Sequence, residues 1–216
     1  MPPVPAYSWT GCYVGAHAGG GWQTSGYVTG AGIASGVGGL GGAQAGCNYQ
    51  IRQFVIGLEG EFWGSTLSDR NHFSETGIGS EESVSRNRWD GAISVRSGVA
   101  FDRAFVYGKL GAVWGKFDYT TDVAFPGFAL TERGDAIFTG VLIGVGFEYA
   151  LTDNWTTKFE YNYIDYGNKI VNFTQVRCDP DCVTATFSQT VKEAKQLAKI
   201  GFNYKFNYAD PIHARY

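Results

Sequence analysis

Four cysteines are the residues with the clearest capacity for chemistry, at positions 12, 47, 178 and 182. In an exported protein, cysteines form structural disulfides more often than metal or catalytic sites. Cys178 and Cys182 flank the short segment Asp179-Pro180-Asp181. This spacing predicts a local disulfide that closes a hairpin, and metal capture by the two aspartates is the alternative.

Cys12 and Cys47 form the second candidate pair. Both fall on the same side of two neighbouring segments in which apolar and polar residues alternate, and the connection between these segments is centred midway between the two cysteines. If the segments pair as antiparallel strands, the cysteines can face each other within the Cα separation that a disulfide needs. The sequence therefore indicates either a cross-strand disulfide or two buried free thiols.

Three histidines could act as bases or metal ligands: His17, His72 and His213. Only His72 has neighbours of the kind that a hydrolase uses, namely Asp69, Ser74 and Glu75. Catalysis also requires a third group that orients the base, and this composition is ordinary for a polar loop. We therefore expect no enzymatic activity. His72 is the one candidate for an axial haem ligand, with a solvated side chain as the alternative.

Ten charged residues form a balanced set on the polar side of the alternating segments. They are Glu59, Glu61, Asp90, Arg96, Lys109, Glu148, Lys158, Glu160, Lys199 and Lys205. Acids and bases that face a closed interior neutralise one another, and removing one partner costs more than the pair contributes in net stability. The sequence thus predicts a lumen ion-pair network that plugs the interior. A proton or small-solute path along these charges is the alternative.

Alternation with a period of two recurs in eight segments and predicts the strands that position these residues. In the clearest segment, Val141, Ile143 and Val145 alternate with glycine or leucine. The predicted strands cover residues 9–22, 39–50, 54–66, 87–101, 104–118, 136–150, 155–167 and 195–208. No stretch approaches the roughly 20 apolar residues of a membrane-spanning helix, so an all-β chain is expected.

The connections between these strands alternate in length. Residues 51–53, 102–103 and 152–154 are tight turns, whereas four connections are long: 23–38, 67–86, 119–135 and 168–194. This alternation is typical of an eight-stranded antiparallel up-and-down transmembrane β-barrel with short periplasmic turns and long extracellular loops. We interpret the chain as one barrel (9–208) with a periplasmic N-terminal segment (1–8) and a C-terminal tail (209–216).

The two faces of the strands are assigned from the width of such a barrel. Eight strands leave an interior just wide enough for side chains, so rings such as Phe54, Trp114 and Phe147 fit better outside, against lipid. Tryptophans near the predicted strand ends would then form interfacial belts. These are Trp22, Trp63, Trp89 and Trp114 at the extracellular end, and Trp9 and Trp155 at the periplasmic end.

Composition limits the class of protein further. The 216 residues include 31 glycines and 16% aromatic residues, as curved closed sheets with aromatic girdles require. The net charge of -3, with no basic cluster, gives no footprint for nucleic acid. Residues 1–5 have neither the charged nor the apolar region of a signal peptide. We therefore expect a mature chain whose signal peptide has been removed.

Four segments resemble a known family: SWTGCYVG (8–15), GCNYQ (46–50), FVIGLEGE (54–61) and IGFNYKF (200–206). They are similar to the small alphaproteobacterial porin-family barrels known as outer-membrane immunogenic proteins, with an OmpA-like transmembrane barrel. The resemblance spans nearly all the predicted strands and is weak in the long loops. It implies insertion by the barrel assembly machinery, with the aromatic-rich last strand as the recognition signal, and roles in envelope integrity and host contact. Some family members bind haem.

Two departures from the family pattern matter. Members usually carry an aromatic residue where Cys12 and Cys47 stand, which strengthens the pairing of these two cysteines. Members also tend to end at the final strand, whereas this chain continues to Tyr216.

Together, residues and resemblance predict an integral protein of the bacterial outer membrane with a structural, surface-exposed role, no catalysis and no resident metal or cofactor. A haem-binding or small-solute pore barrel is the alternative. The expected partners are outer-membrane lipid, lipopolysaccharide, the barrel assembly machinery and other envelope proteins, and nucleic acid is not among them.

Overall fold

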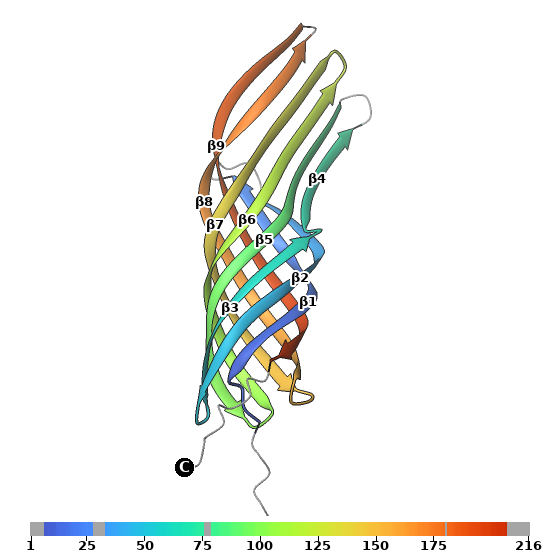
Figure 1. Ribbon diagram of the computed structural model, residues 1–216. Helices are drawn as coiled ribbons and strands as arrows, with labels where there is room; N and C mark the ends of the chain where they lie inside the picture. The colour runs from blue at the N-terminus through green and yellow to red at the C-terminus, as the bar shows by residue number, and fades with distance from the viewer. Residues whose placement is uncertain (1–6, 28–32, 76–78, 180, 207–216) are drawn as a thin grey trace, which may run out of the picture.

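The computed structural model describes residues 7–27, 33–75, 79–179 and 181–206, which form antiparallel strands (Figure 1). The strands are β1 (Gly11–Tyr27), β2 (Ile33–Ile51), β3 (Phe54–Ser65), β4 (Ser68–Glu75), β5 (Gly79–Phe101), β6 (Ala104–Phe125), β7 (Phe128–Ala150), β8 (Trp155–Asp179) and β9 (Asp181–Lys205). Among these residues, no helix is long and apolar enough to cross a membrane.

The strands close into one ring. Neighbours follow the order β3-β2-β1-β9-β8-β7-β6-β5-β4, and an additional pairing of β3 with β5 closes the sheet. Both β3 and β4 pair with β5, β3 along its second half and β4 along its first, so they are successive segments of one ring position. The nine strands therefore occupy eight positions, and the predicted eight-stranded antiparallel barrel is confirmed.

One rim of the ring, the turn rim, carries the short connections 52–53, 102–103 and 151–154. Ile51 pairs with Phe54, and Phe101 pairs with Ala104, so two of these hairpins have only two residues between the paired ends. The first of those two residues has a positive φ in both cases, 57° at Arg52 and 52° at Asp102. Tight hairpins favour this conformation because it matches the twist of the flanking strands.

The opposite rim differs from the sequence prediction. Most of the residues expected in long loops continue the strands, which rise above the ring as a curved sheet (Figure 1). We call this the hairpin sheet, made of residues 68–75, 79–88, 116–135, 168–179 and 181–191. At its tips, Phe125 pairs with Phe128 and Asp179 pairs with Asp181. The loops were mispredicted because their composition is polar, yet outward-facing polar residues are what a sheet in water requires.

Two irregularities mark the junction between ring and hairpin sheet. In β5 the register shifts between Asn87 and Trp89, and in β8 it shifts between Asp165 and Asn168, where Gly167 has a φ of 63°. An extra residue in one strand exchanges the inward and outward positions beyond it. A prediction that keeps one parity along these strands therefore assigns the upper residues to the wrong face.

The interior of the barrel is filled in three layers. A lower apolar layer near the turn rim consists of Tyr7, Trp9, Val55, Ala100, Phe105, Tyr107 and Ala150. A charged layer lies in the middle, and an upper apolar layer extends into the hairpin sheet. The upper layer includes Leu40, Trp63, Leu67, Val113, Phe117, Tyr119, Phe138, Leu142, Ile164, Tyr166, Val171, Phe173, Val191 and Leu197.

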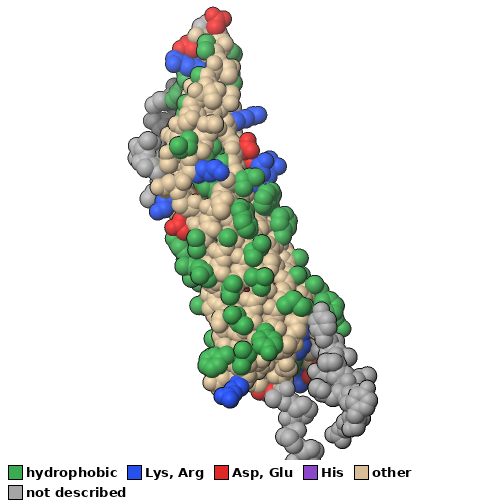
Figure 2. All heavy atoms as spheres, turned by 60° about the vertical axis from the view of Figure 1, so that its left-hand side comes forward, with side chains coloured by type: hydrophobic (Ala, Val, Ile, Leu, Met, Phe, Trp, Pro, Cys, Tyr) green, Lys and Arg blue, Asp and Glu red, His purple; other side chains and the backbone are tan. Residues whose placement is uncertain are grey.

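The outer wall of the ring is apolar. Outward side chains such as Phe54, Ile143 and Phe147 are about half exposed, and Figure 2 shows such side chains around the lower part of the molecule. Along β6 the outward apolar residues run from Val106 to Trp114, close to the roughly 9–11 residues of a membrane-crossing strand. This wall suits lipid rather than water.

Candidate functional site

The charged layer is the most elaborate side-chain constellation of the lumen. It contains four carboxylates and four cations, all buried: Glu59, Glu61, Glu148, Glu160, Arg96, Lys109, Lys158 and Lys199. They come from six strands, β3 and β5 to β9. The alternation of each strand sends every second side chain inward, so ring closure alone brings together residues far apart in the chain.

Lys109 lies at the centre of this layer. Its Nζ is 2.6 Å from Glu59 Oε1, 2.6 Å from Glu61 Oε2 and 3.4 Å from Glu160 Oε2. Lys158 contacts the same three carboxylates, with its Nζ 3.1 Å from Glu59 Oε2 and 3.1 Å from Glu160 Oε1. The two ammonium groups therefore neutralise a cluster of acids that could not otherwise be buried together.

Lys199 and Arg96 extend the network to either side. The Nζ of Lys199 is 2.7 Å from Glu61 Oε1. The Nη1 of Arg96 is 2.9 Å from Glu148 Oε2, and its guanidinium carbon lies 4.6 Å from the centre of the Tyr13 ring. Each carboxylate of the layer thus meets at least one cation, as buried charges require.

Two tyrosines join the charged layer to the wall. The hydroxyl of Tyr13 donates to Glu59 Oε2 at 2.7 Å, and the hydroxyl of Tyr107 donates to Glu160 Oε1 at 2.7 Å. Both side chains lie close to a glycine: a Cβ added at Gly46 would be 2.4 Å from the Tyr13 oxygen, and one at Gly146 would be 2.4 Å from the Tyr107 ring. These two glycines leave the room that the tyrosines need to reach the acids.

A metal could be sought here, because oxygens of Glu59, Glu61 and Glu160 lie within 4.8 Å of one another. Lys109 contacts all three carboxylates, so a divalent cation would have to displace its ammonium group. The donor set therefore suits internal ion pairs better than a metal.

The structure brings eight of the ten predicted lumen residues into this layer and places the other two elsewhere. Asp90 lies higher, in the upper apolar layer, where Lys195 Nζ is 2.8 Å from its Oδ1 and the Tyr166 hydroxyl donates to the same oxygen. Lys195 is the first residue of the predicted strand 195–208 but was not assigned to the predicted ion-pair network. The inward, odd-numbered parity of β9 continues through Lys195 to Glu193, and this was the signal that could have identified both residues.

Lys205 lies at the turn rim, where the N-terminal residues enter the barrel. Its Nζ donates to the carbonyl of Ser8 and lies 4.0 Å from the centre of the Tyr7 ring. Trp9 is 1% exposed, and its Nε1 donates to the carbonyl of Asp102 at 3.0 Å. Tyr7 and Trp9 therefore cap the lumen from below. Residues 1–6 and 207–216 lie outside the described residues.

The predicted positions of two belt tryptophans are wrong. Trp9 and Trp63 are buried inside the barrel, in the lower and upper apolar layers. Trp22, Trp114 and Trp155 face outward with 43%, 36% and 49% exposure. Parity, rather than distance from a strand end, decides which tryptophans reach the lipid.

Both cysteine pairs are disulfide-bonded. Cys12 and Cys47 stand opposite each other in the register of β1 and β2 and are joined by an S–S bond of 2.03 Å. Cys178 and Cys182 are joined across the tip of the β8–β9 hairpin. One bond thus fastens two strands of the ring, and the other closes the far end of the hairpin sheet.

The histidines are not brought together. His17 points into the lumen, where its Nδ1 lies 2.6 Å from Gln44 Oε1. His72 lies in β4 opposite Glu82, but its side chain is outside the described part of the structure, as is all of His213. Haem ligation by His72 therefore remains a prediction, and it is testable by spectral titration against a His72→Ala variant.

Two outer-membrane proteins resemble this chain in sequence, and one solved structure resembles it in fold. The 31 kDa outer-membrane immunogenic protein of Brucella melitensis is 31% identical over 94% of this chain and 86% of its own length. The 22 kDa outer membrane protein of Rhizobium leguminosarum bv. viciae is 28% identical over 95% of this chain and 82% of its own length. Among solved structures, the outer membrane protease OmpT from Escherichia coli is similar in fold alone, with a TM-score of 0.57 at 10% identity over 95% of this chain and 100% of its own.

The family model for the outer membrane protein beta-barrel domain matches residues 1–206. This match agrees with the closed eight-position ring, the apolar outer wall and the relatives from two bacterial genera. The turn rim accordingly faces the periplasm and the hairpin sheet faces the exterior. The chain belongs to the outer-membrane β-barrel family and is an integral protein of the bacterial outer membrane.

Proposed function

We propose that this barrel is a closed, non-catalytic component of the outer membrane that supports envelope integrity and presents the hairpin sheet at the cell surface. The observation that carries the proposal is the filled lumen. Every carboxylate of its charged layer contacts a cation, and apolar layers cover this layer on both sides.

The packing of the lumen argues against passage of solutes. An ion that moved along the axis would first meet Tyr7 and Trp9 at the periplasmic mouth. It would then have to break ion pairs around Lys109, and next cross an apolar layer that contains the fully buried Phe117 and Phe138. Each step removes a charge from its partners or from water, which is costly among buried side chains.

The form of the hairpin sheet supports a role at the surface. Its inward side chains, among them Tyr119 and Phe173, are buried, while outward neighbours such as Asn172 and Thr174 are exposed. An apolar core beneath a polar surface stabilises a sheet in water. The hairpins can therefore hold a fixed shape outside the membrane, as a display or contact surface requires.

The final strand supports delivery by the barrel assembly machinery. Ile200, Phe202, Tyr204 and Phe206 face outward and are between 37% and 53% exposed. The family resemblance implies that an aromatic-rich last strand of this kind is the recognition signal. The assembly machinery therefore belongs to this proposal, together with outer-membrane lipid as the solvent of the wall.

Two measurements test the proposal. In planar lipid bilayers, the inserted wild-type chain should show no stepwise conductance at any voltage at which an open porin conducts, and protease protection should confirm insertion. In cells, deletion of the chain should increase sensitivity to detergent and uptake of a hydrophobic dye, and the wild-type gene should restore both. Regular channel openings would reject the closed lumen, and unchanged permeability after deletion would reject the envelope role.

A further inference from the structure

Basic side chains gather on the outer wall just above the apolar belt. Arg88 of β5, Lys116 of β6 and Arg133 of β7 line one groove of about 600 Å³. Lys116 follows the outward Trp114 on the same side of β6 and pairs in register with Ile137. In Figure 2, blue side chains likewise begin where the green belt ends. The groove therefore lies at the height where lipid tails give way to headgroups.

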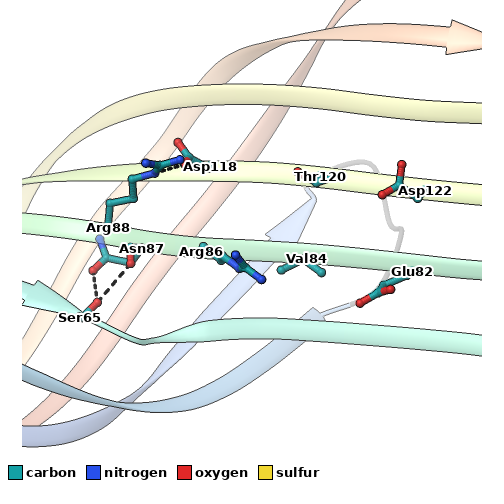
Figure 3. A pocket seen from close by; sticks show the side chains of 9 residues that line it. All are labelled: Ser65, Glu82, Val84, Arg86, Asn87, Arg88, Asp118, Thr120 and Asp122. Atoms are coloured by element: carbon teal, nitrogen blue, oxygen red, sulfur yellow. Dashed lines mark hydrogen bonds and ion pairs between the residues drawn. The ribbon is translucent and has the colours of Figure 1, made fainter.

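The charges in this groove are not balanced. Arg88 pairs with Asp118, as Figure 3 shows, and Lys116 Nζ lies 3.5 Å from Asp135 Oδ2. Arg133 is exposed and makes no ion pair with any residue that the structure describes. Three cations thus face two carboxylates, and one guanidinium is left available for an anion.

Neutral donors complete the groove. Asn172 and Thr174 of β8 line it beside Arg133, and Thr174 is the register partner of Arg133. Guanidinium groups bind phosphate oxygens through paired hydrogen bonds, and amide and hydroxyl groups add further donors. These guanidinium, amide and hydroxyl donors on adjacent strands fit a phosphate group better than an apolar ligand or a metal ion.

We infer that this groove binds a phosphate group in the headgroup of an outer-leaflet glycolipid. Its position selects a lipid over a soluble anion, because Trp114 and Ile137 below the groove offer contact for acyl chains. The inference does not depend on whether the lumen is closed, so its outcome is independent of the conductance test.

The test measures binding of lipid A by native mass spectrometry on the refolded full-length chain in detergent. Phosphorylated lipid A is compared with lipid A from which the phosphates have been removed. The wild type should bind the phosphorylated form more tightly, and Arg133→Gln should lower that affinity by about fivefold, the effect of one cation near a membrane surface. The triple variant Arg88→Gln/Lys116→Gln/Arg133→Gln should bind the two lipids equally.

Arg52→Gln is the matched control, since Arg52 is an exposed cation in a turn at the periplasmic rim. It should leave both affinities unchanged, and far-UV circular dichroism should show the same fold for every variant. Equal binding of both lipids by the wild type, or an unchanged preference in the triple variant, would overturn the inference. So would displacement of the lipid by an equal concentration of pyrophosphate, because the groove would then be a site for soluble anions.

Discussion

The ring and the hairpin sheet are built from the same strands but have opposite polarity. In the ring, outward residues such as Ile143 are apolar, and inward residues such as Lys109 are charged. In the hairpin sheet, outward Asn172 is polar and inward Phe173 is apolar. The backbone pairing continues through both regions. The surroundings differ: lipid lies outside the ring and water lies outside the hairpin sheet, while the inner side chains of both are buried.

This comparison shows that alternation reports the contrast between two faces and not which face is buried. A β-strand keeps its period of two in either solvent. The outward face of a strand is apolar where lipid lies outside and polar where water lies outside. The contrast between the two regions predicts three differences in stability, of decreasing size.

The largest effect is expected from removing the central cation of the lumen. Lys109→Met removes one of the two ammonium groups that contact the same three buried carboxylates. The excess buried negative charge should lower the free energy of unfolding by about 3–5 kcal/mol. Lys116→Met removes an outer-wall cation whose side chain is 35% exposed beside Asp135, and the expected loss is below about 1 kcal/mol. Urea unfolding in lipid vesicles measures both. Equal losses would show that the charged layer is hydrated and screened.

The second prediction compares the two disulfides. The Cys12–Cys47 bond joins residues 35 positions apart, whereas Cys178–Cys182 spans 4 positions. From loop-closure entropy, replacing the first pair by serines should cost about 4 kcal/mol and replacing the second about 2 kcal/mol. Unfolding of the two double variants, with the wild type under reducing conditions as a control, measures the difference. A larger loss from the tip bond would mean that the hairpin sheet, rather than the ring, limits stability.

The third prediction places one charge on the outer face of each region. Ile143→Lys puts an ammonium group against lipid and should cost about 2–4 kcal/mol. Asn172→Lys puts the same group on the hairpin sheet in water, where the change should stay within about 0.5 kcal/mol. The comparison uses the same vesicle unfolding assay. If Asn172→Lys cost as much as Ile143→Lys, the membrane boundary would lie higher than the groove that Arg88, Lys116 and Arg133 line.

Much of the charged layer could be predicted because its residues lie on strands of constant parity. Glu59 and Glu61, or Lys158 and Glu160, are two residues apart and must share a face, and Cys12 and Cys47 follow from the hairpin that joins β1 and β2. These relations are local, and the alternation of side chains along a strand is sufficient to predict them.

The missed features depend on breaks in that regularity. The bulges at Asn87 and Asp165 exchange inward and outward positions, and the polarity of the pattern reverses above the membrane. Both effects made the hairpin sheet look like loops. Trp9 was placed in a belt because it lies at the periplasmic end of the first predicted strand, but its hydrogen bond to the carbonyl of Asp102, 93 residues away, holds it inside the barrel.

The sequence by itself determined that the chain is a closed β-barrel of eight positions with acids and bases in equal number on its inner face. Alternation and turn spacing are properties of short segments, and they survive without knowledge of the rest of the chain. Only the tertiary structure decided which acid meets which base, that Lys195 pairs with Asp90, and that Arg133 forms no ion pair with a described residue. Those contacts depend on the stagger of strands around the ring, a quantity that no single strand contains.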